Sequence, residues 1–400
     1  MNKFASLING ARIKKRYHSN QRDPKVWVFG EWFGQRCCDN SMYLANYIAE
    51  KYPEIQVYWA SRKDADLSGL RQEVGKISFG DEEAILVYKK AGVVFMNQGY
   101  QDFSDEGVNY FSGAVCVNLW HGVMWKHIGH DGSKQSGLIY RLYTKANDSV
   151  FGANAYVATS EDYAKVCETA FGAMPEQVIR AGYPRNSIFY QAQELLACRK
   201  LVLDTLVSET GINWPDNTRI ITYMPTFRDK AENSFSFEEL AGDKRLMNWL
   251  EDNNTVILQK AHLITQQRHE MESIKAQKRI FAFNNVAAQI LLAATDLLIT
   301  DYSSCFFDYL ILDRPIIHFI YDYDYYVNQD RGVYYKKEEI CCGDIAMSKE
   351  ELPELIIQNM ENPQKEQLLR AQRREEFMTY DTPDTCELIF EAVQERLQKS

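Results

Sequence analysis

Short apolar runs recur along this chain at the spacing expected of β–α–β units. Most of the intervals between them show the periodicity of amphipathic helices, and Asp39-Asn40 is expected to cap one of these helices. The runs lie at residues 26–30, 56–60, 92–96, 115–119 and 155–159 in the first half of the chain, and at 220–224, 255–259, 279–283, 297–300 and 316–320 in the second half. This alternation predicts parallel sheets with helices on both faces, because parallel strands are joined by helical crossovers and are buried on both sides.

The length of the chain favours two domains. Its 400 residues exceed the size at which a single hydrophobic core usually stops growing. A predicted helix at 191–208 and a turn-rich segment at 213–217 mark the most natural division. We therefore expect an α/β protein with two doubly wound, Rossmann-like domains. The predicted boundaries are 1–25 for a basic N-terminal segment, 26–186 for the first domain, 187–218 for a linker or hinge, and 219–400 for a second domain that ends in helices.

Composition and charge narrow the classes of function. The net charge of −10 argues against a nucleic-acid-binding protein, which would normally carry a basic surface. An anionic substrate would need a local cluster of Arg, Lys and His. The nine cysteines show no CxxC spacing, which indicates reduced, mostly structural thiols in a cytoplasmic protein. The sequence shows no signal peptide and no apolar stretch near about 18 residues, so we expect no membrane-spanning segment.

Residues 296–320 predict a strand, a turn, a short helix and a second strand. The first strand ends at Thr300, and Asp301, Ser303 and Ser304 follow it in the turn. Either serine can cap the helix, which we expect to end at the Asp-Arg-Pro sequence that follows. A helix N-terminus offers unpaired N–H groups and a partial positive charge, so this turn suits a phosphate. The alternative is an ordinary βαβ turn with a capping serine.

Reactive side chains follow several predicted strands at their carboxyl ends. They are His121 after the run 115–119, Arg228 after 220–224, His262 after 255–259 and Asp301 after 297–300. Ligands of doubly wound sheets bind at this edge. Lys260 and His262 point to the same side, and two such groups suit a pyrophosphate. The alternatives are a loop-bonding role for His121, a surface ion pair for Arg228, and simple solvation of the strand end for Lys260 and His262.

Four segments together resemble a known family. They read LWHGVMWK at 119–126, GYPRN at 182–186, YMPTFRD at 223–229 and TDYSSCFFDYLILDRP at 300–315. In this order they resemble the CDP-glycerol glycerophosphotransferases, which build teichoic acids and related capsular polymers. The resemblance runs from about residue 25 to about residue 390. Two departures, VMW for the usual TPL before Lys126 and Leu263 for the usual proline after His262, bear on substrate identity more than on reaction type.

The resemblance implies a role for each matching residue. It implies an acceptor-side first domain and a nucleotide-donor-binding second domain that face a cleft, as in the glycosyltransferase-B arrangement. His121 and His262 would be catalytic, with His121 as the general base. The residues expected to bind the donor are Arg228, Thr300, Asp301, Ser303, Ser304 and Arg331, and those expected on the acceptor side or at the hinge are Gly122, Lys126, Arg185 and Asn186. No cofactor and no protein-bound metal is implied, since CDP-glycerol is a substrate.

Two other segments allow more than one interpretation. His127 and His130 lie near Asp131 with a loose metal-site spacing, but a positively charged rim that includes Lys126 is the favoured interpretation. The tyrosine-rich loop at 321–335 can form an aromatic wall for cytosine or a polyol, or it can cover the last strand.

The N-terminal segment is basic and one-sided. Phe4, Leu7, Ile8 and Ala11 fall on one helical face among seven Lys and Arg residues within residues 1–25. Such a segment can lie on an anionic membrane surface, as a lipid-linked acceptor would require. A terminal helix that is frayed or docked on the protein is the favoured alternative.

The family resemblance therefore implies a glycerophosphotransferase, and we expect it to act at the inner face of the cell membrane. It would transfer glycerol phosphate from CDP-glycerol to a hydroxyl of a lipid-linked or polymeric acceptor and release CMP. The alternatives are a CDP-ribitol-dependent ribitolphosphotransferase, a nucleotide-sugar glycosyltransferase of the same fold, and a non-catalytic binding or scaffold protein.

Overall fold

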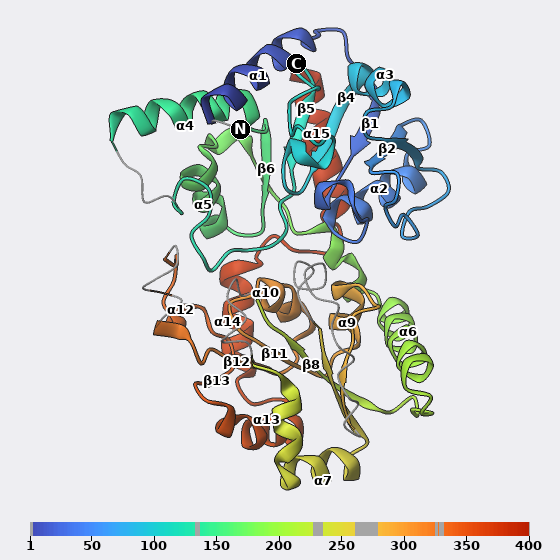
Figure 1. Ribbon diagram of the computed structural model, residues 1–400, viewed down its shortest axis with the longest axis vertical. Helices are drawn as coiled ribbons and strands as arrows, with labels where there is room; N and C mark the ends of the chain where they lie inside the picture. Colours follow the sequence, from blue (N-terminus) through green and yellow to red (C-terminus); the bar gives the residue numbers. More distant parts are fainter. Residues whose placement is uncertain are drawn as a thin grey trace. The chain divides into compact units, whose positions relative to one another are not determined.

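Two parallel sheets organise the chain in the computed structural model (Figure 1). The structure describes residues 3–132, 137–226, 235–260, 279–324, 327 and 332–399. Each sheet belongs to one compact unit. Unit 1 comprises residues 1–121, 128–187 and 379–400, and unit 2 comprises residues 122–127 and 188–378.

Unit 1 is built on a seven-stranded parallel sheet. Its strands, in spatial order, are β3 (Gly75–Ser78), β2 (Gln56–Ser61), β1 (Asp23–Phe29), β4 (Ala91–Met96), β5 (Val115–Asn118), β6 (Ala155–Ala158) and β7 (Val178–Arg180). The helices of this unit are α1 (Lys3–Arg16), α2 (Asn40–Lys51), α3 (Glu82–Lys90), α4 (Leu138–Phe151), α5 (Glu161–Phe171) and α15 (Thr385–Lys399). The strand order reverses between β1 and β4, so the ligand-binding edge is expected at the carboxyl ends of these strands.

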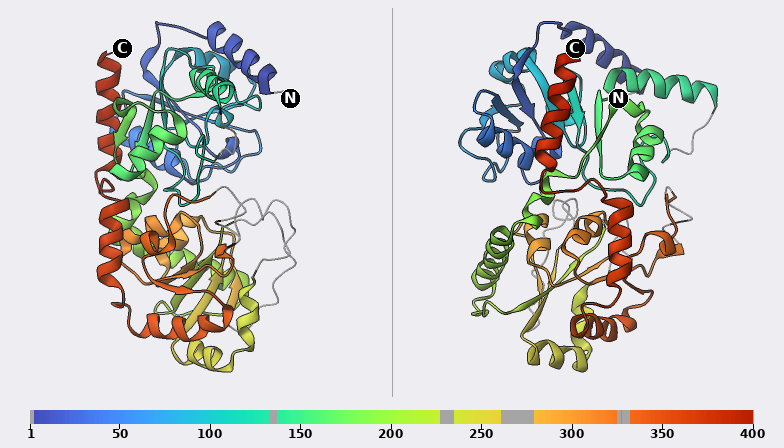
Figure 2. Two further views of the ribbon diagram at one scale, coloured as in Figure 1. Left: turned by 90° about the vertical axis from the view of Figure 1, so that its left-hand side faces the viewer. Right: turned by 180° about the vertical axis from the view of Figure 1, so that it is seen from behind.

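Apolar residues on both faces of this sheet explain the layers of unit 1. Side chains such as Trp27 and Phe95 pack on one face with residues of α2 and α15. Side chains such as Val28 and Val94 pack on the other face with residues of α3. The views in Figure 2 show α15 along the sheet of this unit. A strand that is buried on both faces reads as a continuous apolar run, which is why these strands were predictable.

Unit 2 is built on a six-stranded parallel sheet. Its strands, in spatial order, are β10 (Ile280–Ala282), β9 (Thr255–Gln259), β8 (Arg219–Met224), β11 (Leu297–Thr300), β12 (Ile316–Phe319) and β13 (Asp344–Ala346). Its helices are α6 (Ala192–Thr210), α7 (Lys244–Asp252), α9 (Ala288–Ala294), α10 (Cys305–Tyr309), α12 (Lys337–Ile340), α13 (Leu352–Glu361) and α14 (Gln367–Phe377). Here the order reverses between β8 and β11.

The predicted fold class is confirmed, and each predicted strand is present. Three further strands, β3, β7 and β13, have no counterpart among the predicted runs. Each lies at the edge of its sheet and has only three or four residues, of which one or two are buried. An edge strand is covered less completely, so its sequence lacks the continuous apolar signal.

The division into units differs from the predicted boundaries. Residues 188–218, predicted as a linker, belong to unit 2, where Arg199 of α6 donates to the carbonyl of Ala294 over 2.9 Å. Residues 379–400, predicted in the second domain, belong to unit 1, because α15 buries Ile389 and Val393 in the core of that unit. The periodicity of a helix shows that one face is apolar, but it does not show which sheet that face covers. The cleft expected between the two domains stays a prediction.

The N-terminal segment forms a helix that packs within unit 1. Helix α1 lies beside α4, and a Cβ atom at Gly10 would come within 2.4 Å of the Phe151 ring. Lys14 Nζ donates to the carbonyl of Ser149 over 2.5 Å. Of the two forms of the favoured alternative, frayed or docked, the structure shows the docked helix. Among the residues that the structure describes, no helix has the length and apolar character needed to cross a bilayer.

Candidate active site

The turn after β5, which carries His121, contains a residue in a strained backbone conformation. Trp120, the residue before His121, has a φ of 56°, which is unusual for a bulky side chain. The backbone N–H of Trp120 donates to Asn118 Oδ1 over 2.8 Å, and its ring stacks on the imidazole of His121 with centroids 4.4 Å apart. Such strain costs about 1–3 kcal/mol for each residue and concentrates at functional sites.

A second strained turn follows β1. Trp32 and Phe33 have φ values of 48° and 57°. Gln98 Oε1 accepts from the N–H of Trp32 over 2.7 Å, and Asp102 Oδ1 accepts from the N–H of Phe33 over 2.9 Å. Burial raises the pKa of Asp102 to about 6. The Trp32 ring lies 6.3 Å from the imidazole of His121, so strained turns from two strand ends meet around this histidine.

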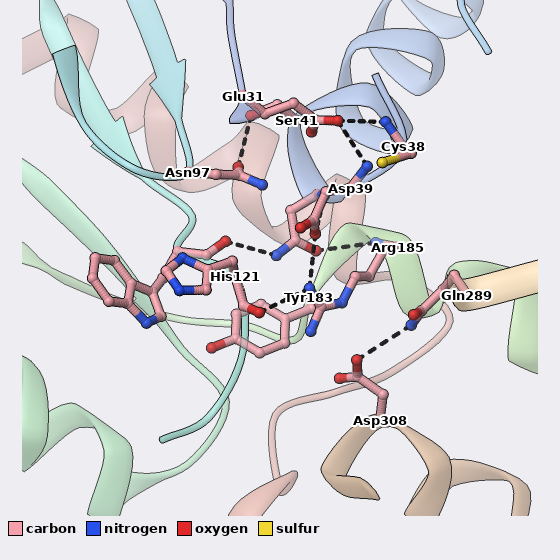
Figure 3. A network of polar contacts seen from close by, with 12 residues as sticks. Glu31, Cys38, Asp39, Ser41, Asn97, His121, Tyr183, Arg185, Gln289 and Asp308 are labelled. Atoms are coloured by element: carbon pink, nitrogen blue, oxygen red, sulfur yellow. Dashed lines mark hydrogen bonds and ion pairs between the residues drawn. The ribbon is translucent and has the colours of Figure 1, made fainter. Parts of the chain in front are cut away.

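The N-terminus of α2 carries a buried acidic cluster (Figure 3). Asp39 is the N-cap residue, as predicted, and its carboxylate accepts from the N–H of Asn40 over 2.7 Å. The carboxyl group of Glu31 accepts from the N–H groups of Cys38 and Asp39 over 2.5 and 2.8 Å. Burial, together with the negative charge of Asp39, raises the pKa of Glu31 well above its usual range. Sequence reasoning identified Asp39 and Asn40 only as a helix cap.

The GYPRN segment connects three parts of unit 1. Arg185 donates to Asp39 Oδ1 over 2.8 Å and to the carbonyl of His121 over 3.1 Å (Figure 3). Asn186 instead donates to Asp381 over 2.8 Å, and Asp381 also accepts from the N–H of Tyr183 over 2.9 Å. The structure therefore brings Arg185 to His121, while Asn186 fixes the segment that leads into α15.

Residues 122–127 belong to unit 2, where Trp125 anchors them. Its Nε1 donates to the carbonyl of Tyr335 over 2.7 Å, and its ring lies 5.2 Å from that of Tyr302 in the turn at residues 301–304. Lys126, predicted on the acceptor side, pairs with Val333 in an antiparallel bridge and is half-buried. Gly122, with φ of 140°, begins this segment. Trp125 occupies a position where the sequence departs from the family, which was the signal available for it.

The residues around His130 make polar contacts within unit 1. His130 Nε2 lies 2.9 Å from Asp148 Oδ2 on α4. Asp131 accepts from the hydroxyl of Thr169 over 2.6 Å. These contacts give both side chains partners within the fold, and the charged rim expected here stays a prediction.

Thr300 and Asp301 lie at the point where the strand order of unit 2 reverses. Thr300 Oγ1 donates to the carbonyl of Met224 over 2.7 Å. Asp301 Oδ1 accepts from the N–H and the hydroxyl of Thr226 over 2.8 and 2.6 Å. Both residues are fully buried and fix the end of β8, and the donor contact expected of them stays a prediction. Strand periodicity shows which way a side chain points but not which neighbour it bonds.

Ser303 and Ser304 are half-buried beside the N-terminus of α10. Ser304 is the residue before this helix, as expected, but among the described residues its side chain accepts no capping hydrogen bond. Helix α10 continues into a short 3-10 helix at Leu310–Leu312. This helix ends at Asp313, whose φ is 49°, as the Asp-Arg-Pro sequence predicted. The expected contact of both serines with a phosphate stays a prediction.

Lys260 is buried at the end of β9. Its Nζ donates to the carbonyl of Val286 over 2.5 Å, so it fixes the loop that precedes α9. Three predicted site residues, Arg228, His262 and Arg331, lie outside the described residues.

Two doubly wound parallel sheets, each with polar residues at its carboxyl edge, define the class of this protein as a two-unit α/β protein with Rossmann-like sheets. The family described as CDP-Glycerol:Poly(glycerophosphate) glycerophosphotransferase matches residues 13–395, and the chain belongs to this family.

Known relatives agree with this assignment. The chain is 26% identical over 328 residues to a teichoic acid poly(glycerol phosphate) polymerase of Staphylococcus epidermidis, covering 80% of this chain and 44% of that protein. It is 25% identical to a teichoic acid glycerol-phosphate transferase of Staphylococcus aureus, covering 78% of each. The chain thus spans less than half of the first relative. The solved structure of the wall teichoic acid polymerase TagF has the same fold, with a TM-score of 0.77 and 22% identity over 100% of this chain and 98% of that one.

Proposed function

We propose that this chain is a glycerophosphotransferase that moves glycerol phosphate from CDP-glycerol to a hydroxyl of a lipid-linked or polymeric acceptor. The family match along residues 13–395 carries this proposal. The strained turns around His121 support it, because such strain is typical of functional sites.

His121 is the proposed general base. It removes the proton from the acceptor hydroxyl while the hydroxyl oxygen bonds to the β-phosphorus, and the phosphoanhydride bond breaks so that CMP leaves. Arg228 and His262 are proposed to neutralise the charge that develops on the leaving phosphate. Phosphoryl transfer relies on positioning and electrostatics, so the proposal needs neither a covalent nucleophile nor a cofactor.

A panel of donors tests the substrate. The purified protein is incubated with CDP-glycerol, CDP-ribitol, and UDP- or CDP-sugars in the presence of an acceptor, and release of the nucleotide is measured. We expect CDP-glycerol to give the highest rate. A preference for CDP-ribitol or for a sugar donor would support the corresponding alternative, and no release with any donor would support a binding protein.

Replacement of His121 tests the chemistry. His121→Ala should lower kcat by about 10²-fold or more, the contribution expected of a general base. Binding of CDP-glycerol should change little, since the base acts on the acceptor. His18→Ala, at an exposed histidine of the same unit, is the matched control and should retain activity. Normal turnover by His121→Ala would rule out its role as the base.

We further propose that unit 1 meets the inner face of the cell membrane through α1 and α4. Ile8 on α1 is 70% exposed, and Leu138, Ile139 and Leu142 on α4 are 74%, 80% and 60% exposed. Large apolar side chains at this exposure favour burial in an apolar phase. Exposed basic residues on the same helices, which suit anionic lipid, are Arg12, Lys15, Arg16, Arg141 and Lys145.

Vesicle binding tests this surface. The double substitution Ile8→Glu with Ile139→Glu should weaken binding to anionic vesicles by more than about 10-fold, because each buried aliphatic side chain contributes about 1.5–3 kcal/mol. Leu196→Glu is the matched control, since Leu196 is 69% exposed on α6 of unit 2. Equal loss in both variants would show that α1 and α4 are not the membrane surface.

A further inference from the structure

Two backbone carbonyls of the His121 turn are held by side chains from distant parts of unit 1. Asn40 Nδ2 donates to the carbonyl of Trp120 over 3.0 Å. Arg185 donates to the carbonyl of His121 over 3.1 Å. Arg185 is itself held by Asp39, so helix α2 and the GYPRN segment both act on this turn (Figure 3).

The Arg185–Asp39 ion pair is deeply buried. The two side chains are only 8% and 7% exposed. Such a pair is weak evidence for stability, because the loss of hydration offsets most of the attraction between the charges. A role in fixing geometry explains its presence better. One guanidinium nitrogen, Nη1, serves both Asp39 and the carbonyl of His121, so the ion pair aims the group that holds the turn.

The conformation of Trp120 explains why the turn needs these contacts. A left-handed tryptophan is held above its preferred conformation by about 1–3 kcal/mol, so the turn would relax if it were free. Relaxation would rotate the peptide between Trp120 and His121 and move the imidazole with it. A hydrogen bond from a charged donor is worth about 1.5–3 kcal/mol, which is enough to hold such a turn.

We propose that Arg185 and Asn40 are positioning residues that orient the imidazole of His121 through the backbone of its turn. This inference rests on the proposed role of His121 as the general base. Neither residue needs to touch a substrate. Their effect on the reaction passes through His121, so substituting them should lower kcat only while His121 is present. A purely structural role would not show this dependence.

The test is a double-mutant cycle. Arg185→Lys keeps the charge but loses the planar fork, so it should lower kcat by about 10- to 100-fold. The KM for CDP-glycerol should change less than about 3-fold. In a His121→Ala background the same substitution should have almost no further effect on CMP release, because the group that it orients is gone. Asn40→Ala should behave in the same way, and it serves as the second variant if Arg185→Lys does not fold.

Unit 2 offers a matched control. The side chain of Arg370 is 1% exposed and pairs over 3.0 Å with Asp313, whose side chain is 39% exposed, so Arg370→Lys disturbs an ion pair of a buried arginine away from the His121 turn. It should lower thermal stability but leave kcat nearly unchanged. Thermal melts establish that each variant is folded at the assay temperature.

The outcomes separate this inference from the proposed function. Suppose that His121→Ala lowers kcat and that the double variant loses the product of the two single losses in kcat. The positioning role of Arg185 is then wrong, while the role of His121 stands. If His121→Ala retains normal turnover, both are wrong. A loss in Arg185→Lys that vanishes in the His121→Ala background, without such behaviour in Arg370→Lys, supports the inference.

Discussion

Acid should destabilise unit 2 through one buried histidine. His318 lies on β12, fully buried, where Nε2 accepts from the N–H of Cys342 over 3.1 Å. Burial lowers the pKa of His318 from 6.5 to about 4, and a hydrogen bond with the backbone of Asp301 opposes this only in part. The folded protein therefore binds fewer protons than the unfolded chain at pH values between about 4 and 6.5, and its stability falls as the pH is lowered through this window.

The size of the effect follows from the two pKa values. At pH 7.5 the histidine is neutral in both states and contributes almost nothing to the pH dependence. At pH 4.5 the unfolded state is protonated and the folded state is not, which lowers the free energy of unfolding by about 2.5 kcal/mol. His318→Gln removes the titrating group while it keeps a side-chain oxygen that can accept a hydrogen bond. The variant should be less stable at pH 7.5. Between pH 7.5 and 4.5, however, its free energy of unfolding should fall by about 2.5 kcal/mol less than that of the unsubstituted protein.

The measurement must report on unit 2 alone, because two units need not unfold together. Urea unfolding at pH 7.5, 6.5, 5.5 and 4.5 can be followed by pulsed hydrogen exchange of peptides that cover β11 and β12. The pH dependence of the other groups cancels when the protein is compared with His318→Gln. Equal slopes for the two proteins across this range would refute the reasoning, since the histidine would then titrate alike in both states.

Three further results are expected. Ser303→Ala with Ser304→Ala should raise the Kd for CDP-glycerol and for CDP by about one to two decades but barely change the Kd for CMP, because CMP lacks the β-phosphate. Calorimetry on a variant shown to be folded measures these affinities, and an equal loss for CMP would place the turn at the nucleoside. Gly182→Ala should lower the melting temperature clearly, because the added Cβ would lie 2.5 Å from the Cα of Asp381; an unchanged melt would show that this segment shifts freely. Transferase activity should survive EDTA, since the proposed chemistry uses cationic side chains; complete loss that metal restores would contradict it.

The sequence alone determined the class of fold and, from it, the edge of each sheet where a site is expected. Strands buried on both faces contain a continuous apolar run, such as residues 26–29 around Trp27 and 297–299 up to Ile299, so a local pattern identifies them. The cap at Asp39 and the helix end at Asp313 were also local, because each depends on neighbouring residues. His121 could be chosen because a parallel sheet places the residue after each strand at one edge.

The tertiary structure decided which distant residues meet. Arg185 bonds Asp39 across 146 positions of the sequence and the carbonyl of His121 across 64, and no local pattern encodes such pairings. The same holds for α15, whose apolar face fits either sheet by periodicity but packs in unit 1. Asp301 was placed correctly at a strand end, yet its bonding to Thr226 follows from the neighbouring strand in the sheet. Sequence periodicity fixes the direction of a side chain relative to its own element, whereas its partner depends on how the elements are packed.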